Sequence, residues 1–112
     1  IAAAGNTCQA DNNPLAHAEM QVLTRAHTQL AQQDFRNACL FVTLEPCPMC
    51  MGAILHSHLG QLVYGASNLK WGCCGTVIDF HSLFPGEAIT ILGGISEAEC
   101  SELLASFFAG LR

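Results

Sequence analysis

The stretch EPCPMCMGA, residues 45–53, stands where the chain changes from one kind of secondary structure to another. The run before it, ACLFVTL at residues 38–44, is apolar and rich in β-forming residues, which predicts a short buried strand. The run that it opens, PMCMGAILHS at residues 48–57, predicts a helix, with Pro48 tolerated in the first turn. A strand that leads directly into a helix favours an α/β fold.

Strand-like and helix-like segments alternate on both sides of this unit. Ahead of it, IAAAG at residues 1–5 predicts the end of a strand, and residues 15–33 predict a helix. Four residues fall near one face of that helix: Met20, Leu23, His27 and Leu30. After the central unit, strands are predicted at residues 61–67 and 88–94, with a loop punctuated by glycines at 68–76 between them.

The C-terminal segment has the clearest helical pattern. Ser96 and Glu99 have the spacing of a capping box, which marks the start of a helix. The residues that follow at helical spacing predict a stripe buried against the core: Cys100, Leu103, Leu104, Phe107, Phe108 and Leu111. Together the elements predict an α/β sandwich, in which helices cover both faces of one sheet.

The composition is that of one globular domain. The 112 residues are 51% hydrophobic, with a mean hydropathy of +0.35, so the chain can fill a core and is not disordered. No apolar run reaches the length of a membrane span, and no signal peptide is visible. The sequence begins at Ile1 inside a predicted strand, so we expect further sequence upstream.

Charge is sparse and acidic, with four Lys and Arg residues against nine Asp and Glu residues. Proteins that bind nucleic acids usually carry a basic patch that neutralises phosphates. The sequence has no obvious patch of this kind, which counts against a large RNA or DNA partner.

Seven cysteines are present, an odd number. Without a secretory signal, and with enough apolar residues for a core, they indicate reduced thiols or metal ligands in the cytoplasm rather than disulfides. The adjacent Cys73 and Cys74 suit either a second metal site or buried packing thiols, and packing is the commoner use.

Cys47 and Cys50 are three residues apart at the start of a predicted helix, so they share one face. The helix dipole stabilises thiolates there, and two thiolates at this spacing can clamp Zn²⁺. The same spacing occurs in redox pairs. Pro46 and Pro48 stiffen the chain on either side of Cys47 and favour one fixed geometry for the thiols.

His17 is the best candidate for a third ligand, because it also stands at a predicted helix start. His56 and His58 follow the cysteines too closely for a zinc finger and fall at the far end of the helix. Three protein ligands leave one tetrahedral position for water, which is typical of a catalytic zinc site. Glu19, two residues after His17, could then carry protons.

The pattern H-x-E followed by P-C-x-x-C is the signature of zinc-dependent nucleobase deaminases. The chain resembles the cytidine/deoxycytidylate deaminase superfamily and is most similar to its bacterial tRNA-specific adenosine deaminase branch. The stretches that carry the resemblance are GN (5–6), NPLAHAE (13–19), TLEPCPMCMGAILHS (43–57), VYGASNLKWGCCGT (63–76) and GGISEAECSELLASFF (93–108). The resemblance implies a three-layer α/β/α sandwich with a mixed sheet, a homodimer, and a helix and strand ahead of residue 1.

The resemblance also implies roles for individual residues. His17, Cys47 and Cys50 would hold one Zn²⁺ per chain, with water or hydroxide as the fourth ligand. Glu19 would carry protons while water attacks the ring carbon that bears the amino group. Four residues would contact the substrate: Asn6 the base, Ala18 the base through its backbone, Pro46 as a pocket wall and Asn68 near the sugar.

Three features differ from the tRNA-editing branch. Ser67 stands where those proteins often carry Arg, the loop TCQADNN at 7–13 has no Arg, and the ending FFAGLR lacks a basic tail. A second function therefore stays open, the deamination of guanine, cytosine or a cytidine nucleotide. A third is a zinc-stabilised interaction module without catalysis, although such a module has no use for Glu19.

Overall fold

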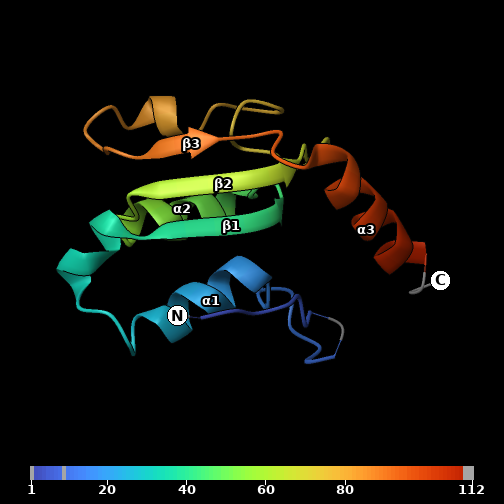
Figure 1. Cartoon of the computed structure of the whole chain (residues 1–112), viewed down its shortest axis with the longest axis horizontal. Coiled ribbons are helices and arrows are strands. Elements are labelled where there is room, and N and C mark those ends of the chain that lie inside the picture. Colours follow the sequence, from blue (N-terminus) through green and yellow to red (C-terminus); the bar gives the residue numbers. More distant parts are fainter. Residues whose placement is uncertain (1, 9, 110–112) are drawn as a thin grey trace.

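The computed structural model of the chain describes residues 2–8 and 10–109, and its centre is a three-stranded parallel sheet (Figure 1). The strands are β1 (Cys39–Leu44), β2 (Gln61–Ala66) and β3 (Thr90–Leu92), in that order across the sheet. The helices are α1 (Ala18–Ala26), α2 (Pro48–His56) and α3 (Glu97–Ala109), with 3₁₀ turns η1 (Gln32–Asn37) and η2 (His81–Leu83). The α/β fold predicted from the sequence is confirmed. Within the described residues, no helix is long and apolar enough to cross a membrane.

The segments β1, α2 and β2 form a β–α–β unit. β1 and β2 pair in parallel, with Phe41 opposite Val63 and Leu44 opposite Ala66. Parallel neighbours need a crossover connection, and α2 supplies it. The carboxyl ends of both strands therefore lie at one edge of the sheet, and the turn at 45–47 leaves β1 at that edge to begin α2.

One face of the sheet carries the main hydrophobic core. Leu40 on β1 and Leu62 on β2 are register partners, and both are buried. From α2, Met51 and Ile54 pack into this core with no exposed surface, and α1 adds Leu23. Each buried side chain of this size stabilises the fold by about 1.5–3 kcal/mol. α1 and α2 thus cover the same face of the sheet.

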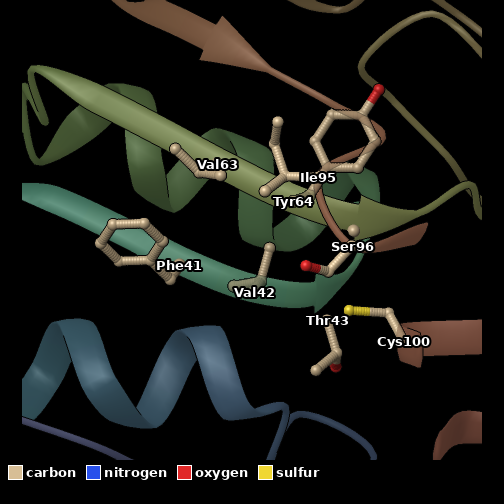
Figure 2. A pocket seen from close by; sticks show the side chains of 9 residues that line it. Phe41, Val42, Thr43, Val63, Tyr64, Ile95, Ser96 and Cys100 are labelled. Atoms are coloured by element: carbon tan, nitrogen blue, oxygen red, sulfur yellow. The ribbon is translucent and has the colours of Figure 1, made fainter. Parts of the chain in front are cut away.

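The opposite face of the sheet is largely open. Phe41 on β1 is 73% exposed, and Leu92 on β3 is 47% exposed. α3 covers only the carboxyl end of this face, where Cys100 packs so closely that a Cβ on Gly65 would lie 2.3 Å from its Sγ. Figure 2 shows the shallow apolar groove between β1, β2 and the start of α3. Because parallel sheets are normally covered on both faces, the third layer of this sandwich is only partly formed.

The sheet is parallel throughout the described residues, so the mixed sheet expected from the resemblance is not seen. Residues 2–5, predicted as the end of a strand, join no strand. Instead, side chains of α1 donate hydrogen bonds to the backbone of residues 2–5. Arg25 donates to the carbonyl of Ala3 at 2.6 Å, and Gln21 donates to that of Gly5 at 2.9 Å.

The helix predicted at 15–33 is shorter at both ends. At the start, Asn13 accepts hydrogen bonds from the amides of Leu15 and Ala16, which makes a turn ahead of α1. At the end, the Thr28 amide and hydroxyl both bind the carbonyl of Arg25, the acceptor that a further α-helical turn would need. Thr side chains compete with helices in this way.

The final helix is confirmed, but the buried stripe predicted for it is wrong at Leu103, which is 60% exposed. Cys100 and Leu104 are only half-buried. The helix runs past the edge of the sheet, so little apolar surface lies beside it (Figure 1). Ser96 has a φ of 52°, not the extended backbone of a capping-box N-cap. Three side chains of the stripe lie outside the described residues: Phe107, Phe108 and Leu111.

Truncation of Leu62 should destabilise the protein far more than truncation of Leu103. Leu62 has no exposed surface, so Leu62→Ala removes core contacts and leaves a cavity, at a cost of about 2–5 kcal/mol in the free energy of unfolding. Leu103 is exposed, so Leu103→Ala should change this free energy by less than about 0.5 kcal/mol. Urea denaturation followed by circular dichroism measures both. Equal losses would contradict the one-sided core.

Candidate active site

Two helix starts meet at the carboxyl edge of the sheet, and each has a potential metal ligand at its N-cap. His17 is the N-cap of α1 and Cys47 is the N-cap of α2, and neither side chain makes a capping hydrogen bond. N-caps are usually Ser, Thr, Asp or Asn, whose side chains bind the free amides of the first turn. Here the two side chains approach each other instead.

His17, Cys47 and Cys50 form a compact cluster, the metal-ligand group, whose side chains could hold a metal ion. His17 Nδ1 lies 3.7 Å from Cys47 Sγ and 3.5 Å from Cys50 Sγ, and the three ligand atoms all lie within 4.8 Å of one another. A tetrahedral Zn²⁺ with its usual bond lengths separates nitrogen and sulfur ligands by about 3.6 Å. The group therefore fits such an ion, and it is the one cluster of this kind in the part of the chain that is described.

The charge of the group also favours a cation. Cys50 has no exposed surface, and burial raises the pKa of its thiol, as do the nearby Glu19 carboxylate and Cys47. Two thiolates and a carboxylate at one place repel one another, and a divalent metal ion reverses that balance by binding the deprotonated thiolates. Glu19 stands in the first turn of α1, two residues after His17, and is half-buried.

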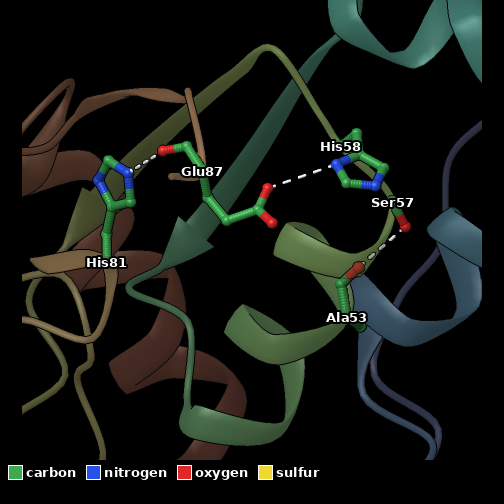
Figure 3. A network of polar contacts seen from close by, with 5 residues as sticks. All are labelled: Ala53, Ser57, His58, His81 and Glu87. Carbon is green, nitrogen blue, oxygen red and sulfur yellow. Dashed lines mark hydrogen bonds and ion pairs between the residues drawn. The ribbon is translucent and has the colours of Figure 1, made fainter. Parts of the chain in front are cut away.

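The histidines after the cysteines lie at the other end of α2, as expected from the sequence. His56 is the last residue of α2 and is exposed. His58 Nδ1 lies 3.3 Å from a carboxylate oxygen of Glu87, whose carbonyl contacts the ring of His81 (Figure 3). This polar network fastens the turn after α2 to the segment ahead of β3. Neither His56 nor His58 belongs to the group of His17, Cys47 and Cys50.

Cys73 and Cys74 behave as packing thiols. Cys73 is 1% exposed and donates to the carbonyl of Trp71 at 3.3 Å, and Cys74 Sγ lies 3.9 Å from Met51 Sδ. Burial raises the pKa of both thiols, to about 12 at Cys74, where the Glu45 carboxylate adds to the effect. Neither thiol belongs to a group of His, Cys, Asp and Glu side chains able to hold a metal ion in the described part of the chain, so the alternative of a second metal site gains no support.

The segment that carries Asn6 is held against the start of α1. Gln21 donates its side-chain amide to the carbonyl of Gly5 and to the hydroxyl of Thr7, both at 2.9 Å. Asn6 lies between these two anchors and is exposed. Ala18, the first residue of α1, is half-buried. Both residues predicted to contact the base therefore belong to the region around the N-terminus of α1, beside the metal-ligand group.

Pro46 and Asn68, which the resemblance predicts to contact the substrate, are both engaged within the protein. Pro46 is fully buried. Asn68 Oδ1 accepts hydrogen bonds from the amides of Lys70 and Trp71, at 3.2 and 3.0 Å. The side-chain NH₂ of Asn68 donates to the backbone carbonyl of Glu45 at 3.5 Å. The Asn68 side chain therefore shapes its own loop.

Glu45 was not singled out from the sequence. It is 1% exposed, between the end of β1 and the turn that carries Cys47. The signal that could have found it is a carboxylate placed directly after an apolar strand, because a buried charge is stable only with partners.

Comparison with known proteins identifies the family of the chain. The sequence profile of the MafB19-like deaminases matches residues 1–109. The chain is 40% identical over 114 residues to the tRNA-specific adenosine deaminase of Bacillus subtilis, and the match covers 100% of this chain and 70% of that protein. It is 38% identical over 112 residues to the tRNA(Ile)-lysidine synthase of Deinococcus deserti, but it spans only 21% of that protein's length. A solved structure from a study of A-to-I editing by tRNA:A34 deaminases is 38% identical and has a TM-score of 0.81, over 91% of this chain and 75% of the other.

The fold, the site and these relatives define a nucleobase deaminase, an enzyme that removes a ring amino group by hydrolysis. The chain belongs to the MafB19-like deaminase family. The resemblance to the tRNA-specific adenosine deaminases, first seen in the motifs, is confirmed by matches that cover 91–100% of this chain.

Replacement of His17 by Asn should remove metal without unfolding the protein. Asn is a favoured N-cap, so α1 keeps its start, but the nitrogen ligand is lost. We expect metal affinity to fall by at least about tenfold. Elemental analysis after dialysis against a weak chelator measures the metal content, and circular dichroism measures the fold. His56→Asn, at the exposed end of α2, is the matched control and should keep its metal. Unchanged metal content in His17→Asn would contradict the ligand assignment.

Proposed function

We propose that this protein is a zinc-dependent tRNA adenosine deaminase, which converts adenosine to inosine and releases ammonia. The observation that carries the proposal is the group formed by His17, Cys47 and Cys50 where two helices start, with Glu19 in the first turn of α1 two residues after His17. The relatives named for tRNA adenosine deamination support adenine as the base and tRNA as its carrier.

The metal would be held by His17 Nδ1 and by the thiolates of Cys47 and Cys50. Three protein ligands are the usual number in a catalytic zinc site. When bound, zinc would lower the pKa of a water ligand to about 7 and so supply a nucleophile at neutral pH.

Glu19 would carry the protons of the reaction. Its carboxylate is half-buried on the first turn of α1, two residues after His17. There it can accept a proton from the attacking water and deliver it to the ring nitrogen, and then pass the second proton of that water, from the new hydroxyl, to the departing amino group. Water and the amino-purine are consumed, and the keto-purine and ammonia are formed. General acid–base catalysis of this kind contributes about 10²–10⁴-fold in rate.

Asn6, Ala18, Pro46 and Asn68 are proposed as substrate contacts. Asn6 and Ala18 belong to the region around the start of α1, where an amide side chain and backbone groups can bind the edge of a base. Pro46 would form part of the pocket wall, and Asn68 would lie near the sugar of the target nucleotide.

A small-molecule deaminase is the second candidate, and the acidic charge favours it. Four basic residues against nine acidic ones offer few contacts to RNA phosphates. Free guanine, free cytosine or a cytidine nucleotide would need no such contacts. Glu19 argues against the third candidate, an interaction module in which zinc is only structural.

We also propose that the protein acts as a homodimer in the cytoplasm. The open sheet face, with Phe41 and Leu92 exposed, supports self-association because exposed apolar area often marks an interaction surface. All seven cysteines are free, which suits a reducing compartment. Light scattering that gave a monomer at micromolar concentration would contradict the dimer.

Glu19→Gln should abolish turnover and leave the metal bound. The amide cannot accept a proton, so kcat on an anticodon stem-loop should fall by about 10²–10⁴-fold. Mass spectrometry of the inosine product measures the loss. Glu99→Gln, on the exposed surface of α3, is the matched control and should keep full activity. A Glu19→Gln enzyme that keeps wild-type turnover would rule out the proton-carrying role.

A single deamination panel separates the candidate substrates. It contains the anticodon stem-loop, adenosine, guanine, cytosine, cytidine and its nucleotides, each at low salt, where an acidic protein binds RNA best. Conversion of the stem-loop alone is the expected result. Conversion of one small molecule alone would replace tRNA with that substrate, and zinc-loaded protein that converts nothing would favour the interaction module.

A further inference from the structure

Glu45 is a buried carboxylate for which the reaction has no use. It lies directly after β1 and is 1% exposed. A charged group in such a position is stable only when hydrogen bonds replace its lost water. Its partners therefore show what it does.

All the side-chain partners of Glu45 come from the loop at 68–76. One carboxylate oxygen accepts the amide of Asn68 at 3.2 Å and the hydroxyl of Thr76. The other accepts the amides of Cys74 at 2.7 Å and Thr76 at 3.3 Å. The approach is so close that a Cβ on Gly72 would lie 2.7 Å from a Glu45 oxygen. The Glu45 carboxylate is thus hydrogen-bonded to both ends of the loop, at Asn68 and at Thr76.

The same loop is also fixed to the turn that carries a metal ligand. The carbonyl of Pro46, between Glu45 and Cys47, accepts the amide of Cys73 at 3.0 Å. The backbone of Glu45 donates to Ala66 at the end of β2, at 2.9 Å. The turn at 45–47 and the loop at 68–76 are therefore joined along their length.

We propose that Glu45 is a positioning residue, which holds the loop at 68–76, and with it Asn68, in one register against the metal-ligand turn at 45–47. The proposal rests on the proposed function, because it assigns Glu45 to the substrate-binding side of that site. Its effect should fall on substrate binding, and the proton transfer by Glu19 should be little changed.

A carboxylate is required because both of its oxygens face donors. In Glu45→Gln, one oxygen becomes an NH₂ group, which cannot accept a hydrogen bond. In one orientation it faces the backbone amides of Cys74 and Thr76, and in the other it faces the backbone amide of Asn68, so at least one loop amide loses its acceptor either way. Glu45→Asp keeps the charge but is one methylene shorter. Thr76→Val removes one donor from a residue that is exposed and leaves the carboxylate itself intact.

The test compares these three variants with wild type and with Glu102→Gln, an exposed control on α3. Amide hydrogen exchange by NMR follows Cys74 and Thr76 directly and needs no substrate. Steady-state kinetics on the anticodon stem-loop separate KM from kcat, elemental analysis gives the metal content, and thermal denaturation gives the folded fraction.

For Glu45→Gln we expect the two amides to exchange at least about tenfold faster, and KM to rise by about tenfold with kcat and metal content nearly unchanged. Thr76→Val should shift both quantities in the same direction by about threefold, and Glu45→Asp should lie between wild type and Glu45→Gln. If Glu45→Gln does not fold, the amide exchange and KM of Thr76→Val still test whether Glu45 holds the loop.

Unchanged exchange in the variants would overturn the proposal. So would activity that falls only in proportion to the folded fraction, because that is the result of a purely structural role. If wild type converts no substrate of the panel, the proposed function fails, while the exchange rates still decide whether Glu45 holds the loop.

Discussion

The site depends on one constraint, that the N-termini of α1 and α2 lie next to each other. α2 is fixed by the sheet, because β1 and β2 hold its two ends in parallel register. α1 comes from an earlier part of the chain and is placed by packing, through Leu23, against the core that contains Ile54. The distances among the three ligand atoms therefore rest on the hydrophobic core as much as on the ligands themselves.

The protein gives up helix stability at this point. A Ser or Asp at the N-cap of each helix would stabilise it by about 1 kcal/mol, yet His17 and Cys47 stand there without capping bonds. Glu45 is a similar case, since a charge is buried at a strand end where an apolar residue would cost nothing to desolvate. Such conflicts between local rules and the structure are expected where residues are kept for function.

The central unit could be predicted closely from the sequence. The strand predicted at 38–44 is observed as Cys39–Leu44, and the helix predicted at 48–57 is observed as Pro48–His56. Proline and glycine residues next to an apolar run mark its ends in the sequence, which is why these bounds could be predicted. The proximity of His17, Cys47 and Cys50 was also expected, because each residue stands at the start of a predicted helix.

What could not be predicted depends on distant contacts. Leu103 has the spacing of a core residue, but nothing local shows that its helix runs past the sheet. The partners of Glu45 come 23 to 31 residues later in the chain, so only the folded structure reveals them.

The separation of the ligands along the chain has a consequence for the stability of the folded protein. His17 and Cys47 are 30 positions apart, so an ion held by both would act as a cross-link that closes a loop of that length. In the chain-entropy picture such a closure disfavours the unfolded chain by about 3–4 kcal/mol. The ion would then stabilise the fold as well as supply a nucleophile, so removal of zinc by a chelator would also lower the free energy of unfolding.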